Sequence, residues 1–92
     1  MRLIDFVKNL HDFDDEAIIF QENRSDVNSD IFISYAEEGD EGVKEELGRK
    51  YSYLLEVFLA KEFIEDWVAS LRRKPTVEQI TKRLHEYAIN DA

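Results

Sequence analysis

The side chains of this sequence best suited to acid–base chemistry near neutral pH are two histidines, His11 and His85. Each lies in a segment with helical periodicity. Neither has a second His or a Ser at the spacing of a catalytic dyad or of a metal-ligand pair. The chain contains no Cys, and its three glycines do not form a phosphate-binding loop. We therefore expect structural histidines at surface or half-buried positions, no enzymatic activity and no cofactor.

A polar segment in the first half of the chain matches the opening of a calcium-binding loop. Asp26, Asn28 and Asp30 alternate, and Glu37 falls at the twelfth position of the motif. The sixth position, where such loops need glycine for a sharp turn, is Ile31. We therefore expect no metal site here, and interpret the segment as a hairpin loop whose Asp and Asn side chains cap their own backbone.

The acidic residues are concentrated in the first half of the chain. Residues 1–48 hold fourteen Asp and Glu against four Lys and Arg, a net charge of −10, whereas residues 49–92 hold seven against eight, a net charge of +1, which together give −9. A strongly acidic region produces a field that attracts basic partners and repels nucleic acid and anionic membranes. The same acids could instead serve only to keep the protein soluble.

The pattern of apolar residues predicts one domain over residues 1–92, in the α+β class, with a small antiparallel sheet packed against helices in two layers. A Thr76–Gln79 capping box and Pro75 separate the last two helices. The predicted elements, in the order α-β-β-β-α-α, are a helix at 2–13, strands at 17–20 and 31–36, a short turn of helix at 43–47, a strand at 50–57, and helices at 59–73 and 77–89.

The segment from residue 43 to residue 71 allows a second interpretation. Tyr51, Tyr53, Leu55 and Val57 alternate as in a strand, but the apolar spacing of the whole segment also fits one long helix. Gly48 favours the first interpretation, because it could close a short helix, and a third strand would stabilise a marginal hairpin. The alternative fold is α-β-β followed by one long helix and a C-terminal helix.

The predicted hairpin of strands 17–20 and 31–36 would bring the acidic segments 12–16 and 37–46 to one end of the sheet. Eleven acids, including Glu22 and Glu46, would then flank that end, and an exposed Tyr beside them is typical of binding surfaces. The predicted partner-binding residues are Asp12, Asp14, Asp15, Glu16, Glu37, Glu38, Asp40, Glu41, Glu45 and Tyr53.

Two features of the second half have structural interpretations. The basic residues Arg72, Arg73 and Lys74 are expected in the last turn of the helix at 59–73, where cations interact favourably with the helix dipole. Trp67 lies on the apolar stripe of the same helix, and we expect it in the core with Phe63 and Leu71.

These observations favour a small cytoplasmic protein that binds and inhibits a basic partner protein, such as a nuclease or a nucleic-acid-binding channel, as immunity proteins and nucleic-acid mimics do. We expect no direct binding to nucleic acid or membrane. The alternative is a non-catalytic adaptor or structural subunit that uses its apolar helical half. In element order and charge, the predicted acidic α+β domain resembles some small phage-encoded anti-CRISPR proteins, which implies inhibition of a nucleic-acid-guided defence system.

Overall fold

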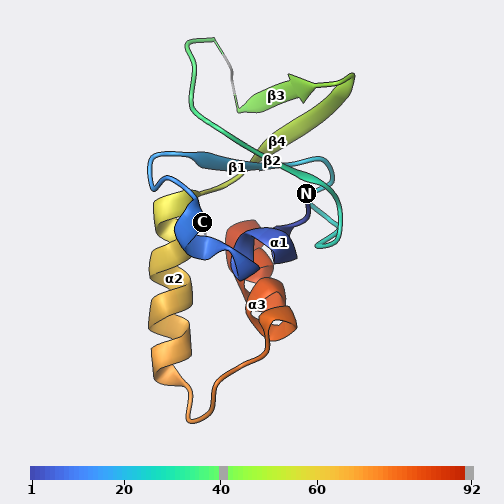
Figure 1. Ribbon diagram of the computed structural model, residues 1–92. Coiled ribbons are helices and arrows are strands. Elements are labelled where there is room, and N and C mark those ends of the chain that lie inside the picture. Colours follow the sequence, from blue (N-terminus) through green and yellow to red (C-terminus); the bar gives the residue numbers. More distant parts are fainter. Residues whose placement is uncertain (40–41, 91–92) are drawn as a thin grey trace.

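The computed structural model describes residues 1–39 and 42–90, which form a four-stranded antiparallel sheet and three α-helices (Figure 1). The sheet, in the order β2-β1-β4-β3, lies at one end of the molecule, and α2 and α3 run away from it as a helical hairpin with α1 beside them. The elements are α1 (Leu3–Lys8), the 3₁₀ turn η1 (Leu10–Asp12), β1 (Ile18–Gln21), β2 (Ile31–Ser34), β3 (Val43–Glu46), β4 (Arg49–Glu56), α2 (Val57–Ser70) and α3 (Val77–Asn90).

The α+β class is confirmed, but the predicted helix at 43–47 is wrong, because these residues form β3. Leu47 and Gly48 have φ angles of 51° and 79°, as the two central residues of a tight hairpin turn require, and they connect β3 to β4. Gly48 therefore makes a hairpin turn and not a helix end. The long-helix alternative is also wrong, since Arg49–Glu56 is a strand. The element order is α-β-β-β-β-α-α. The resemblance to anti-CRISPR proteins was based on the predicted order α-β-β-β-α-α, which the structure does not have.

An irregularity in β4 changes which side chains face the helices. Ile19 pairs with Leu55, whereas Phe20 pairs with Tyr53, so Leu54 is an extra residue in β4. Leu54 and Leu55 are both buried in the core, and Tyr53 lies on the other face of the sheet with Phe20. The alternation expected for β4 therefore breaks at Leu54.

The core lies between the helices and one face of the sheet. Strand residues such as Ile19 and Leu55 meet Phe6 of α1 and Leu84 of α3 there. In the same layer, His85 of α3 makes a 3.0 Å hydrogen bond with Gln21 of β1, so this histidine is buried and not at the surface or half-buried position expected. The opposite face carries a smaller aromatic group, in which the Lys44 ammonium lies over the Phe20 ring; its rings belong to Phe20, Phe32, Tyr51 and Tyr53.

The predicted start of α3 is confirmed, whereas the predicted end of α2 is wrong. The capping box is confirmed, because the Thr76 N–H donates to Gln79 Oε1 at 2.8 Å and the Gln79 N–H donates to Thr76 Oγ1 at 3.1 Å. Helix α2 ends at Ser70, so the basic residues 72–74 lie beyond it and not in its last turn. Trp67 is half-buried and outside the buried core, and Leu71 is 37% exposed, so the prediction that Trp67 lies in the core is wrong.

Candidate functional site

The acids that precede β1 meet the end of β2 at one edge of the sheet. Ile18 pairs with Ser34 of β2 and with Glu56 of β4, so residues just outside these pairs lie together. The Tyr35 hydroxyl donates a 3.0 Å hydrogen bond to Asp14 Oδ2, which closes this edge. We call this surface the acidic edge; it comprises Asp12, Asp14, Asp15, Glu16, Tyr35, Glu56 and Phe58.

The acidic edge surrounds a shallow pocket of about 400 Å³ lined by Asp15, Glu16, Ile18, Ala36, Glu56 and Phe58. Phe58 is 44% exposed and Tyr35 is 50% exposed, although both are large aromatic residues. Exposed aromatic side chains are enriched where proteins bind one another. The edge therefore combines carboxylates with aromatic contact area around a concave surface.

Internal contacts hold two of these carboxylates in place. Lys61 Nζ lies 2.6 Å from Asp15 Oδ1 and donates to the Phe13 carbonyl oxygen at the same distance. The Glu16 backbone N–H, followed by the Tyr35 hydroxyl, holds the pKa of Asp14 below its ordinary value. The hydrogen bond between Tyr35 and Asp14 also raises the pKa of the Tyr35 phenol. Both groups therefore keep their charge states, anionic and neutral, at neutral pH.

The side chains of Asp12 and Glu16 are exposed and, among the described residues, have no hydrogen-bond or ion-pair partner. Their negative charges face solvent without an internal cation. Of the acids before β1, these two are the most available to an external cation.

The remaining predicted residues do not all join this edge. Glu37 pairs with Lys44 of β3 at 3.3 Å and lies over the sheet, with exposed Glu38 next to it in the chain. Tyr53 is 36% exposed on the same face of the sheet, and burial raises its pKa. Asp40 and Glu41 lie outside the described residues.

The prediction that Glu45, Glu46 and Glu22 flank the same end is wrong. Because residues 43–46 form a strand that runs along β4, Glu45 lies opposite Lys50 and Glu46 opposite Arg49, beyond the other end of β1. The Arg49 Nε lies 3.8 Å from Glu22 Oε2. These acids therefore sit beside cations, at a distance from the acidic edge.

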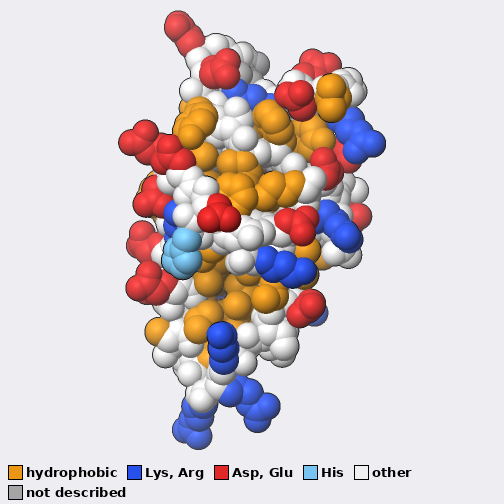
Figure 2. Space-filling model, viewed as in Figure 1, with side chains coloured by type: hydrophobic (Ala, Val, Ile, Leu, Met, Phe, Trp, Pro, Cys, Tyr) orange, Lys and Arg blue, Asp and Glu red, His pale blue; other side chains and the backbone are white. Residues whose placement is uncertain are grey.

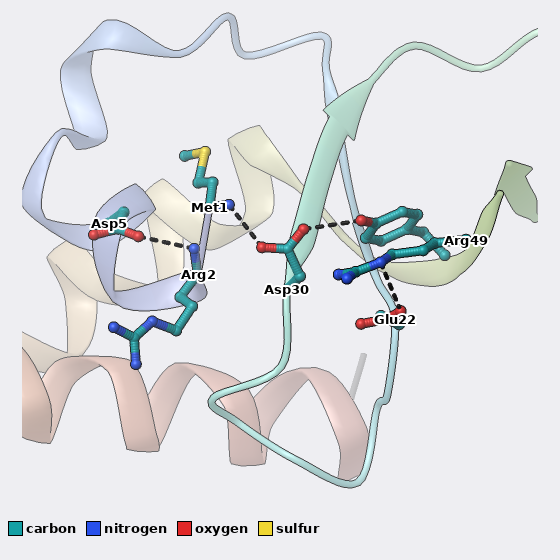
Figure 3. A network of polar contacts seen from close by, with 7 residues as sticks. Met1, Arg2, Asp5, Glu22, Asp30 and Arg49 are labelled. Atoms are coloured by element: carbon teal, nitrogen blue, oxygen red, sulfur yellow. Dashed lines mark hydrogen bonds and ion pairs between the residues drawn. The ribbon is translucent and has the colours of Figure 1, made fainter. Parts of the chain in front are cut away.

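Asp30 also forms hydrogen bonds with other residues of the protein, as Figure 3 shows. Its carboxylate accepts a 2.7 Å bond from the Met1 amino group and a 2.8 Å bond from the Tyr51 hydroxyl. These donors, the Met1 amino group first, hold the pKa of Asp30 below its ordinary value. Asp26 caps the Asn28 N–H at 2.9 Å, as expected for a self-capping loop. Within residues 1–39 and 42–90, no three His, Asp or Glu side chains form a group that could hold a metal ion.

Sequence reasoning confined the acidic surface to residues 12–46 and missed its continuation on α2. Phe58, Glu62, Glu65 and Asp66 are exposed and recur at helical spacing, opposite the buried Ile64 side of the helix. Figure 2 shows acidic side chains along the flank of the molecule where α2 lies and around the sheet, and basic ones at the far end of the helices. The helical period of α2 could have revealed this extension.

Comparison of the chain with family models, with curated proteins and with solved structures gave no match. No helix in the described part of the chain has the length and apolar character needed to cross a membrane.

Proposed function

We propose that this protein binds a basic surface of a partner protein through its acidic edge and thereby blocks that surface. The inhibitor would act as immunity proteins, phage anti-defence proteins and nucleic-acid mimics act, on a nuclease or a nucleic-acid-binding channel. The activity is non-catalytic, needs no cofactor and takes place in the cytoplasm. It involves no direct binding to nucleic acid or membrane.

One observation carries the proposal: exposed carboxylates and the exposed Phe58 ring line a pocket at one edge of the sheet, and the exposed Tyr35 directly precedes Ala36 of that lining. Nucleic-acid channels are lined with Lys and Arg, and a compact acidic surface attracts them over long distance and speeds their encounter. Tyr35 and Phe58 would supply contact area that carboxylates alone lack. Asp12 and Glu16 would supply charge that is not already neutralised internally.

The test is capture of the partner on the immobilised protein, followed by binding of the purified partner to charge-reversal variants. Asp12→Lys with Glu16→Lys should slow association and reduce its dependence on salt, because charges at the rim of an interface act mainly on the association rate. These side chains are exposed and have no hydrogen-bond or ion-pair partner among the described residues, so the fold should be unchanged. The matched control is Glu46→Lys with Glu78→Lys, which changes net charge equally away from the edge. Equal binding by both double variants contradicts the proposal.

A second candidate function, an adaptor that uses the helical half, is favoured by a separate observation: the surface between α2 and α3 is hollowed beside the half-buried Trp67.

A further inference from the structure

The far end of the helical hairpin carries a groove with an apolar floor and a basic rim. The groove has a volume of about 450 Å³ and lies between the end of α2 and the first half of α3. Half-buried Trp67 and partly exposed Leu71 contribute to its floor. Four cations line it, Arg72, Arg73, Lys82 and Arg83, against one acid, Glu86. Figure 2 shows basic side chains at this end of the molecule.

The region around the groove is positively charged, although the protein as a whole is negatively charged. Residues 71–90 hold five Lys and Arg against two Glu, a net charge of +3, whereas the rest of the chain accounts for −12 of the total −9. Within the described part of the chain, none of these cations has an ion-pair partner. An anionic ligand would therefore meet four cations that are not held in ion pairs, which outnumber the single lining carboxylate of Glu86.

Aromatic packing joins the two helices beside the groove. The Phe63 and Tyr87 rings stack at 4.1 Å between centroids and join α2 to α3. The Arg83 guanidinium lies 5.3 Å from the centre of the Phe63 ring, which restrains it beside the groove. A ligand would therefore order fewer side chains on binding than at a surface of free lysines.

The surroundings of Trp67 limit the class of ligand. Trp67 also lines a neighbouring pocket of about 310 Å³ whose wall includes Glu62 and Asp66. A nucleic-acid strand, with a phosphate at every nucleotide, would meet these carboxylates as it passed over the indole. A short peptide can place carboxylates on one side of Trp67 and end there, or continue with uncharged residues.

We propose that this groove binds an acidic peptide segment of a partner protein, with an apolar side chain against Trp67 and Leu71 and with carboxylates paired to Arg72, Arg73 and Lys82. This interaction is independent of the acidic edge. Together, the two would make the protein a link between a basic partner and an acidic one.

Trp67 is the only tryptophan in the chain, so its fluorescence reports directly on the groove. The probe is a short synthetic peptide in which Leu is flanked by Asp and Glu. We expect a saturable change in Trp67 emission that weakens as salt is added. Arg72→Glu with Arg73→Glu should weaken binding by about tenfold, because two exposed ion pairs to the peptide are replaced by like-charge contacts. Both residues are exposed in a loop, and thermal unfolding checks that the fold is kept.

The control variant is Lys50→Glu, an exposed cation on the β3–β4 hairpin at the opposite end of the molecule, which should bind the peptide as the unmodified protein does. A peptide with Asn and Gln in place of the acids should bind much more weakly. The proposal is overturned if that neutral peptide binds equally or if a short oligothymidylate binds more tightly than the acidic peptide. It is also overturned if the protein alone self-associates through the groove, because a second copy would then be the occupant.

Discussion

The two ends of this molecule differ in how their charges are compensated. At the sheet end, carboxylates are numerous but several are engaged: Asp14 with Tyr35, Asp15 with Lys61, and Glu37 with Lys44. At the tip of α2 and α3, the cations are few, but within the described residues they have no acidic partner. The net charge of −9 is therefore the sum of two surfaces of opposite sign, which would attract partners of opposite charge.

The two ends also differ in packing. The buried residues of α2 stop at Ile64, and those of α3 that belong to the hydrophobic core begin at Leu84. Beyond these positions, Trp67 of α2 is only half-buried and lines the pockets beside α3. The buried core therefore lies at the sheet end of the helices, whereas the basic groove lies beyond the last buried residue of α2.

Truncating a side chain should lower the free energy of unfolding far more at the sheet end than at the tip of the helices. Leu55→Ala should lower the free energy of unfolding by about 2–5 kcal/mol, because Leu55 is fully buried between the sheet and the helices. Trp67→Ala should lower it by about 2 kcal/mol or less, since the indole is only half-buried. Urea unfolding followed by circular dichroism measures both. Equal losses would show that the tip belongs to the core.

A second prediction concerns pH. Burial holds the pKa of His85 below its ordinary value of 6.5. Below pH 6.5 the unfolded chain binds a proton there more readily than the folded chain, so the free energy of unfolding should fall as pH is lowered through this window. His85→Gln should flatten this dependence.

The matched control for His85 is His11→Gln, which makes the same substitution at an exposed histidine, and the pH dependence of the two variants is compared. A slope that persists in His85→Gln would assign the pH dependence to other groups.

The smallest effect is local to the acidic edge. The hydrogen bond to Asp14 holds the pKa of the Tyr35 phenol above 10.0, so Asp14→Asn should move it back toward that value. Asp12→Asn removes the same charge without a direct contact and should move it less. NMR titration of labelled tyrosines measures both. If the two variants act alike, the general field of the acids raises the pKa, and not the hydrogen bond.

The elements with a clear apolar pattern or cap could be predicted from the sequence. The β1–β2 hairpin, which brings Asp14 to Tyr35, and the Thr76–Gln79 cap of α3 are examples. The β3 strand could not be predicted, because Val43–Glu46 is a polar edge strand whose pairing depends on the turn at Leu47 and Gly48. Because residues 43–47 were predicted to form a turn of helix, Glu45 was predicted at the wrong end of the sheet.

The groove was missed for a related reason. Apolar spacing extended α2 through residue 73, which placed Arg72 and Arg73 on a helix end. The helix stops at Ser70, and these cations line the groove with Lys82 and Arg83 of α3. The sequence has one basic group on each side of the Pro75 turn, and this pattern could have indicated the groove. Where α2 stops, and therefore which cations share a surface, depends on packing that the sequence pattern does not encode.

We propose that the acidic edge and the basic groove bind separate partners. The most direct measurement is the binding of both ligands, the captured basic partner and the acidic peptide, to the two double variants, Asp12→Lys with Glu16→Lys and Arg72→Glu with Arg73→Glu. The edge variant should lose the basic partner and keep the peptide, and the groove variant should do the reverse. If either variant loses both ligands while remaining folded, or if neither loses its own, the two surfaces are not separate sites and the account is contradicted.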